Sequence, residues 1–156
     1  MNKRGVVICG SMSFYEEMLY LKSKLYEHGV NAIAPDSDDS FYEKVVNIND
    51  VDALNQYKSM ASRLHIRKIW RVSTRAILVV NGKKRNVDNY IGANSLAEVA
   101  LAFALKKKIF LLYGVPAMYS DELSAWGAIP LMGDLLQLIA YVRTPVQEQL
   151  RLPGLD

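Results

Sequence analysis

The sequence contains few of the residues that stabilise small secreted or metal-dependent proteins. Its 156 residues include one cysteine, Cys9, which has no partner for a disulfide within the chain. There are two histidines, His28 and His65, and no cysteine or histidine cluster has the spacing of a metal site. We therefore predict neither a bound metal nor a cofactor, and we interpret Cys9 as an inert core residue.

Long apolar runs are also missing. Charged residues interrupt each run well before the roughly 18 residues that a membrane span requires. No charged segment followed by an apolar stretch and a cleavage site precedes the first strand-like segment. With the lone cysteine, these absences predict a cytoplasmic protein that does not associate with membranes.

Charge of one sign is in small excess. Nineteen Lys and Arg stand against 16 Asp and Glu, a net charge of +3, too little to indicate nucleic-acid binding. Basic clusters at 63–75, 83–85 and 106–108 have no aromatic stacking platform interleaved with them, so we interpret them as solvated faces. The length and the 51% hydrophobic content fit one domain, for which we expect residues 1–143, followed by a tail over 144–156.

The hydrophobic pattern alternates between strand and helix. Apolar runs predict strands at 6–9, 30–34, 76–80 and 109–113 and a short edge strand at 129–131. Helical spacing predicts helices at 14–28, 49–73, 96–105, 119–126 and 135–142. This alternation predicts an α/β three-layer sandwich with a mainly parallel five-stranded sheet of the flavodoxin or Rossmann-like type. Ligands of such sheets bind beyond the carboxyl ends of the strands.

The first loop on that edge is made of Gly10, Ser11, Met12 and Ser13. Its small residues precede a helix N-terminus, where free backbone N–H groups can bind an anion or a hydroxyl group. Ser13 can also be the cap of that helix, with Glu16 completing a capping box. The loop matches neither the dinucleotide nor the Walker pattern.

The second loop runs from Gly92 through Asn94 and Ser95 to Glu98 and opens an apolar helix. If Ser95 caps this helix, Glu98 is the third residue of a capping box and bonds a backbone amide. The alternative is a carboxylate that takes part in chemistry, and the spacing alone leaves both readings open.

The chain resembles the nucleoside 2-deoxyribosyltransferase superfamily, which includes deoxynucleoside monophosphate N-glycosidases. The resemblance covers about residues 6–134: the GSMS loop, a strand ending in Pro-Asp, AILVVN, and NYIGANSLAEVALAFALKKKIFLL, with the block 76–112 the most specific part. It implies that Glu98 is a nucleophile that cleaves an N-glycosidic bond of a nucleoside or a nucleoside 5′-monophosphate. The reaction would pass through a covalent glycosyl-enzyme that water or a second base resolves, with hydrolysis slightly favoured.

The resemblance also implies the other site residues. Asp36 is the candidate acid for the departing base. Lys83, Lys84 and Arg85 belong to a loop that is longer than in the compact hydrolases; a solvated loop is the favoured interpretation, and contact with a 5′-phosphate is the alternative. A homodimer or higher oligomer is expected, in which Met118, Tyr119 and Glu122 complete the partner's pocket. The residues expected to contact substrate are Gly10, Ser11, Met12, Ser13, Asn81, Tyr90, Gly92, Asn94, Ser95 and Tyr119.

Some features depart from the family pattern. Related enzymes carry an aspartate near the third strand, whereas this chain has Lys68, Arg71 and Arg75 in that region. A non-catalytic nucleotide-binding or sensor domain of the same fold is therefore the alternative hypothesis. A phosphoribohydrolase with a PGGxGT-type turn fits less well, because residues 91–95 read IGANS. His65, on the predicted long helix, is expected to be a surface or internally bonded histidine.

Overall fold

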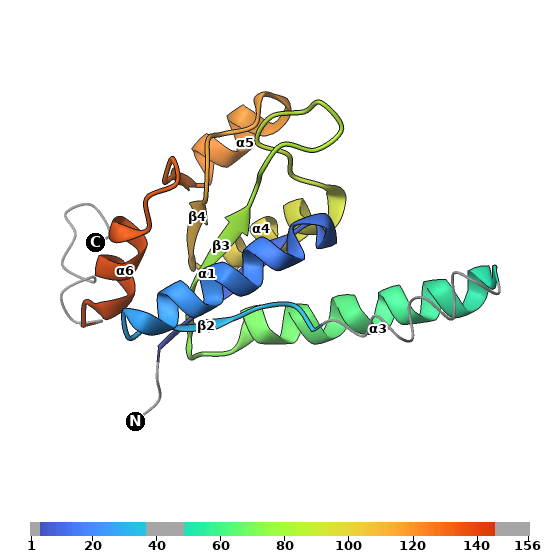
Figure 1. Cartoon of the computed structure of the whole chain (residues 1–156), viewed down its shortest axis with the longest axis horizontal. Helices are drawn as coiled ribbons and strands as arrows, with labels where there is room; N and C mark the ends of the chain where they lie inside the picture. Colours follow the sequence, from blue (N-terminus) through green and yellow to red (C-terminus); the bar gives the residue numbers. More distant parts are fainter. Residues whose placement is uncertain (1–3, 37–48, 146–156) are drawn as a thin grey trace.

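A computed structural model describes residues 4–36 and 49–145 of the chain. Its centre is one five-stranded sheet in the order β2-β1-β3-β4-β5, with every neighbouring pair parallel (Figure 1). The strands are β1 (Gly5–Gly10), β2 (Asn31–Ile33), β3 (Thr74–Val80), β4 (Lys108–Leu111) and β5 (Ile129–Pro130). Helices cover both faces, so the predicted α/β three-layer fold is confirmed.

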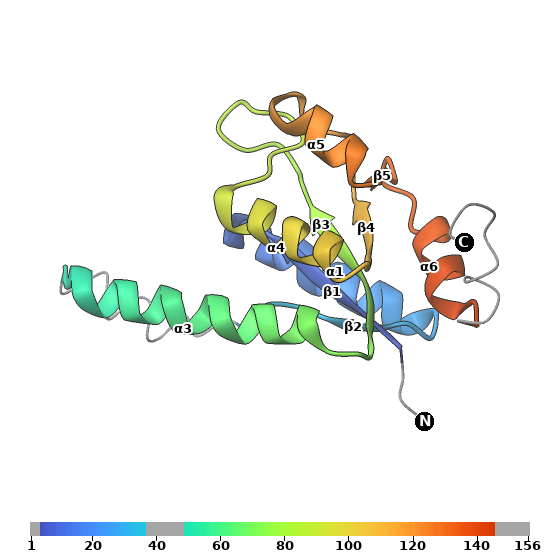
Figure 2. The same cartoon turned by 180° about the vertical axis from the view of Figure 1, so that it is seen from behind.

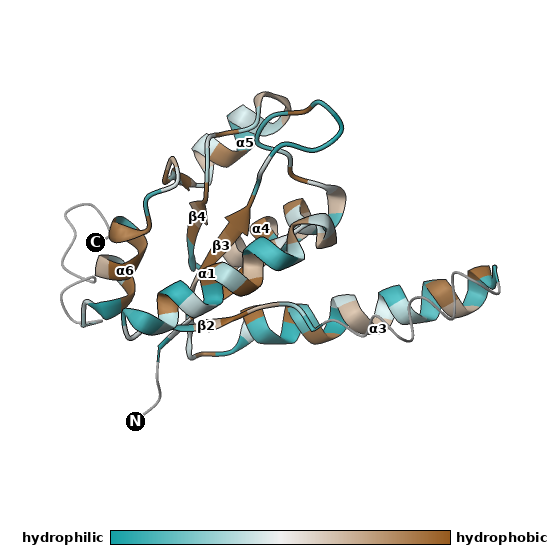
Figure 3. Ribbon diagram, viewed as in Figure 1, coloured by the Kyte–Doolittle hydropathy of each residue, from teal (hydrophilic) through white to brown (hydrophobic). Residues whose placement is uncertain are grey.

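One face of the sheet is covered by α1 (Tyr15–Glu27) and α6 (Leu136–Arg143). Met18, Leu21 and Leu25 of α1 follow the predicted helical spacing and are buried against the strands. The strands under them are apolar over most of their length, as the brown colour of β3 and β4 shows in Figure 3. This burial of apolar surface is the main favourable contribution to folding.

The other face is covered by α3 (Val51–Trp70), α4 (Ala93–Ala104) and α5 (Ser120–Ala125), as the view from behind shows (Figure 2). Ile69, Val99 and Leu123, one from each helix, are completely buried in this second core. Both α3 and α4 therefore pack over β1 and β3, so residues on their inner sides meet the side chains of these strands.

The long helix α3 extends well beyond the sheet (Figure 1). Apolar spacing over 49–73 predicts a buried stripe along this helix that includes Val51, Leu64 and Ile69. That prediction is wrong for the first part, because Val51 and Leu64 are 64% and 41% exposed. Apolar periodicity identifies one side of a helix, but it does not show where the sheet beneath that helix ends.

The start of α1 also differs from the prediction. A short 3-10 helix, η1 (Met12–Phe14), comes first, and its N-cap is Ser11. Ser13 does not cap α1, whose N-cap position is Phe14 with no side-chain bond. The capping box of Ser13 and Glu16 is therefore absent, because the extra turn moves the helix start past it. A second 3-10 helix, η2 (Ala117–Tyr119), precedes α5 in the same way.

None of the helices in the described ranges has both the length and the apolar character needed to cross a bilayer. Of the predicted tail, Thr144 accepts hydrogen bonds from Arg4 and Arg75. The predicted tail from residue 146 onward lies outside the described residues.

Candidate active site at the carboxyl edge of the sheet

The strand order reverses between β1 and β3. The chain leaves β1 toward β2 on one side and later adds β3 on the other, and Gly10 pairs with Val80 where both strands end. Open α/β sheets bind ligands at this kind of switch point. The loops that begin there lead to η1 and to α4, so the two loops selected from the sequence meet at one place.

Gly10 closes the end of β1 in a backbone conformation that favours glycine. Its φ is +152°, and a Cβ atom there would lie 2.8 Å from both the Val80 carbonyl oxygen and the Met18 methyl group. Only glycine allows β1 and β3 to stay in contact up to their last residues. Gly10 therefore shapes the floor of the site.

Ser11, Ser13 and Lys84 form a small polar group above this floor. The Oγ atoms of Ser11 and Ser13 are 3.0 Å apart, and the Ser13 amide donates to Ser11 Oγ. Lys84 Nζ reaches across from the 81–93 loop and donates to Ser11 Oγ at 2.7 Å. That loop is teal in Figure 3, in contrast to the brown strands below it. The group offers hydroxyls, amides and a cation to an anionic ligand.

Glu98 lies in α4, directly beside the switch point. The N-cap of α4 is Gly92 rather than Ser95, so Glu98 is in the second turn and makes no capping bond. The capping-box interpretation is therefore wrong, because the helix starts three residues earlier than it requires. The Glu98 carboxylate instead points toward β1 and α3, and its side chain is only 15% exposed.

Three side chains from three elements meet there. Cys9 of β1, His65 of α3 and Glu98 of α4, hereafter the Cys9–His65–Glu98 cluster, place a sulfur, a nitrogen and an oxygen atom within 4.8 Å of one another. His65 Nε2 is 3.4 Å from Glu98 Oε2. The Cys9 thiol proton can be donated to the Val7 carbonyl oxygen at 3.9 Å or to the Glu98 carboxylate.

Burial disfavours the charged forms of Glu98 and His65. It raises the pKa of Glu98 to about 7, a shift that the Cys9 hydrogen bond partly opposes. Burial and the nearby Lys68 lower the pKa of His65 to about 4. The Ile8 backbone acts to raise this pKa, but its geometry does not meet the criteria for a hydrogen bond to the His65 ring. His65 and Glu98 therefore do not form an ion pair at neutral pH, since His65 is uncharged.

The polar atoms of this cluster are also unsatisfied. Both ring nitrogens of His65 and the Oε2 atom of Glu98 are buried without a hydrogen-bond partner among the described residues. Buried polar atoms in folded proteins nearly always have a partner, so such a group indicates a place for a ligand, a water or an ion. The cluster is therefore a candidate for ligand binding or chemistry at this edge of the sheet.

Asn81, a predicted substrate contact, has a different role. It is fully buried, its Nδ2 donates to the Gly114 carbonyl oxygen at 2.7 Å, and its Oδ1 accepts from the Tyr113 amide at 2.9 Å. Asn89 adds a bond from the Gly114 amide to its Oδ1 at 3.0 Å. Both polar groups of Asn81 are thus used to join the ends of β3 and β4.

The remaining predicted contacts lie in the second loop, in η2 and in η1. Gly92 is covered by the ring of Tyr90, whose face is 5.2 Å from Lys84 Nζ. Asn94 is exposed and Ser95 is buried in the first turn of α4. Tyr119 packs against the second core instead of standing free. Tyr90 and Asn94 thus border the switch point, and Met12, 49% exposed, borders it on the side of the first loop.

Asp36 follows β2 at the same edge but is poorly suited to donate a proton. Its carboxylate accepts from Lys68 Nζ at 2.9 Å and is 76% exposed. This hydrogen bond lowers the pKa of Asp36, which therefore stays ionised at neutral pH. Lys68 also donates to the Ala34 carbonyl oxygen, so the pair fixes the end of β2 against α3.

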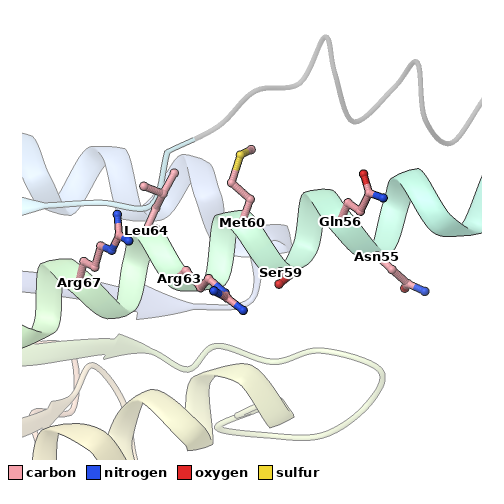
Figure 4. A pocket seen from close by; sticks show the side chains of 7 residues that line it. All are labelled: Asn55, Gln56, Ser59, Met60, Arg63, Leu64 and Arg67. Carbon is pink, nitrogen blue, oxygen red and sulfur yellow. The ribbon is translucent and has the colours of Figure 1, made fainter.

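A hollow of about 520 Å³ runs along α3 (Figure 4). Among the described residues, the side chains that line it come from this helix, and they are Asn55, Gln56, Ser59, Met60, Arg63, Leu64 and Arg67. The cluster residues are not among them. The hollow therefore follows the part of α3 that extends past the sheet, next to the turn that carries His65.

Sequence reasoning missed two members of the cluster. Cys9 is a core residue of β1, as predicted, but its place beside His65 and Glu98 was not foreseen. His65 was interpreted as a surface or internally bonded residue, and it is instead buried with unsatisfied nitrogens. A polar residue on the apolar side of the predicted helix was the only available signal. No protein-family model, no curated protein and no solved structure matches the chain, so the family resemblance stays a hypothesis.

Proposed function

We propose that the protein cleaves the N-glycosidic bond of a nucleoside 5′-monophosphate, with Glu98 as the nucleophile. The observation that supports this most is the Glu98 carboxylate itself, which is free of helix capping, is mostly buried, and lies at the switch point of the sheet. Carboxylates in such sites are common nucleophiles at sugar carbons.

In this mechanism the ionised Glu98 attacks the anomeric carbon while the bond to the base breaks. The transition state carries positive charge on the sugar, which a carboxylate in a site of low polarity stabilises strongly. The covalent glycosyl-enzyme is then released by water, with transfer to a second base as the other outcome. Because the pKa of Glu98 is about 7, the nucleophilic form is present at neutral pH.

The choice of a monophosphate rests on Ser11, Ser13 and Lys84. Lys84 is held over the first loop by its 2.7 Å bond to Ser11, where it can pair with a phosphate close to the Glu98 helix. Lys83, its neighbour in the sequence, instead faces Asp88 at 3.7 Å on the exposed side of the loop. The two lysines therefore make a matched pair for a test.

The first experiment follows free base from a panel of nucleosides and their 5′-monophosphates. We expect base release from monophosphates, and a sugar adduct on the peptide that contains Glu98 when the reaction is quenched and analysed by mass spectrometry. Lys84→Ala should raise KM for monophosphates by about tenfold or more, as expected for the loss of a charged contact, and leave nucleosides unaffected. Lys83→Ala should change neither. No base release from any substrate would overturn the proposal.

The alternative is a nucleotide-binding or sensor domain that does not cleave its ligand. The exposed and ionised state of Asp36 favours it, because the described residues of this edge then hold no evident proton donor for a departing base. In that case a monophosphate raises the melting temperature and is recovered intact after long incubation. Slow conversion of the bound ligand would decide for the enzyme.

A homo-oligomer and a cytoplasmic location also stay predictions. The extended half of α3 exposes Val51, Met60 and Leu64, and a second copy of the chain is the partner that would cover them in a homodimer. Light scattering of the parent and of Met60→Glu tests this. A dimer that becomes a monomer supports the expectation, and a parent monomer at all concentrations contradicts it.

A further inference from the structure

The Cys9–His65–Glu98 cluster combines the donor atoms that borderline-soft metals prefer. The chain has one cysteine and two histidines, and the fold brings the only thiol next to one of the imidazoles and a carboxylate. The second histidine, His28, bonds the Lys24 carbonyl oxygen at the exposed end of α1. Sulfur, imidazole and carboxylate together suit Zn²⁺, whereas Mg²⁺ and Ca²⁺ prefer oxygen alone.

The distances fit a tetrahedral ion. With Zn–N and Zn–O bonds of about 2.0–2.1 Å, two ligand atoms at the tetrahedral angle lie roughly 3.3 Å apart. The His65 Nε2 and Glu98 Oε2 atoms are 3.4 Å apart, so a metal can bind both with little movement. One ligand atom of each residue, the Cys9 sulfur among them, lies within 4.8 Å of the others, so a shift of the Cys9 side chain toward His65 and Glu98 would complete the first coordination sphere.

The unsatisfied atoms point to the same place. His65 is 7% exposed, and neither of its ring nitrogens has a partner in the described part of the chain; Glu98 Oε2 has none either. When the proton of the neutral His65 ring is on Nδ1, Nε2 presents a lone pair to the lone pairs of the Glu98 carboxylate oxygen. A cation between them removes this conflict.

We propose that Cys9, His65 and Glu98 form a three-residue binding site for a borderline-soft divalent metal of the Zn²⁺ type, with the fourth position open to water. Binding displaces the thiol proton of Cys9, which is released to solvent, and any proton on Glu98. The partial exposure of Glu98 marks the side from which the ion enters.

The consequence for activity rests on the proposed function. A metal-bound Glu98 carboxylate cannot attack a sugar carbon, so the metal-loaded protein does not cleave substrate. The site then makes the enzyme sensitive to the concentration of free zinc. Metal binding itself does not depend on this step and is measured separately.

The experiment uses Co²⁺ as a visible probe on the full chain at neutral pH. A thiolate ligand gives a sulfur-to-cobalt charge-transfer band, and tetrahedral geometry gives intense visible bands. Because the chain has one cysteine, the charge-transfer band reports Cys9 alone. We expect one cobalt per chain, complete displacement by Zn²⁺, and a higher melting temperature with Zn²⁺.

Three variants and one control test the ligands. Cys9→Ser should abolish the charge-transfer band, and His65→Gln and Glu98→Gln should each weaken metal binding at least about tenfold. His28→Gln, the matched control at the other histidine, should bind like the parent. Circular dichroism checks folding, and the three ligand variants lie on different elements, so loss of folding in one leaves the other two informative.

The outcomes also separate this inference from the proposed function. Cobalt binding without base release from any nucleotide upholds the metal site and contradicts the enzyme. Base release that Zn²⁺ does not inhibit, with no charge-transfer band, upholds the enzyme and overturns the metal site. Cobalt binding that His28→Gln weakens as much as His65→Gln also overturns the site, because it assigns the metal to the surface.

Discussion

Two groups of buried polar residues lie at the carboxyl edge of the sheet, and they differ in whether their polar atoms are hydrogen bonded. Asn81 has both polar groups bonded to backbone atoms of Tyr113 and Gly114. The Cys9–His65–Glu98 cluster leaves His65 and Glu98 Oε2 without partners. A buried group whose bonds are all made is part of the scaffold, whereas one with open bonds retains the capacity to bind. The comparison therefore assigns stability to the first group and chemistry to the second.

Glu98→Gln tests the chemical side of the comparison and has the largest expected effect. We expect kcat for base release to fall by roughly 10³-fold or more, as for other lost nucleophiles. The variant should unfold at the same denaturant concentration as the parent or a higher one, because burial opposes the ionised carboxylate that the variant lacks.

Glu27→Gln is the matched control, since Glu27 is exposed at the far end of α1 and pairs only with Lys24 in the described structure. It should retain full activity and stability. If Glu98→Gln instead unfolds easily and Glu27→Gln does not, Glu98 is a structural residue and the comparison fails.

Asn81→Ala tests the scaffold side. It leaves the Tyr113 amide and the Gly114 carbonyl oxygen buried without their bonds, which should lower the free energy of unfolding by about 2–4 kcal/mol. Asn55→Ala, at an exposed position of α3, should stay within about 0.5 kcal/mol of the parent. Chemical denaturation of the three proteins gives both values. If Asn81→Ala is as stable as the parent but binds substrate more weakly, Asn81 contacts the substrate after all.

Sequence patterns predicted the scaffold better than the site. Continuous apolar runs such as 76–80 and helical spacing at Met18, Leu21 and Leu25 identify elements, because each pattern follows from local geometry. The position of Glu98 after a small-residue turn also came from the sequence. Its neighbours Cys9 and His65 did not, because they come from other elements and only the packing of α3 and α4 over β1 brings them together.

The role of Asn81 could not be predicted for a similar reason. A polar residue directly after a buried strand fits a ligand contact and a loop tie equally well, and only the path of the β4–α5 loop over Asn81 decides between them. The capping of α4 failed for a more local reason: Gly92 begins the helix three residues before Ser95.

Gly10→Ala should affect both groups at once, with a smaller effect than Asn81→Ala. Gly10 follows Cys9 and contacts Val80, next to Asn81, so a methyl group there separates the two strand ends. We expect a loss of about 2–3 kcal/mol of stability, because the strained backbone and the clash with Val80 both contribute. Gly127→Ala also has positive φ but open space around it, and should cost about 1–2 kcal/mol. Equal losses for the two variants would show that the contact with Val80 is unimportant.

Asp36→Asn should have the smallest effect on stability. Asp36 and Lys68 are hydrogen bonded to each other, but the Asp36 side chain is exposed to solvent. Since Lys68 lowers the pKa of Asp36, the pair stabilises the fold above the unfolded-state pKa of about 3.9, and this contribution disappears as the pH falls through the lowered value. Solvent screening limits the loss at neutral pH to about 0.2–1 kcal/mol. Denaturation of parent and variant at neutral and acidic pH measures it, with Asp88→Asn as the exposed-pair control. If Asp36→Asn costs as much stability as Asn81→Ala, then burial does not separate the scaffold from the surface at this edge.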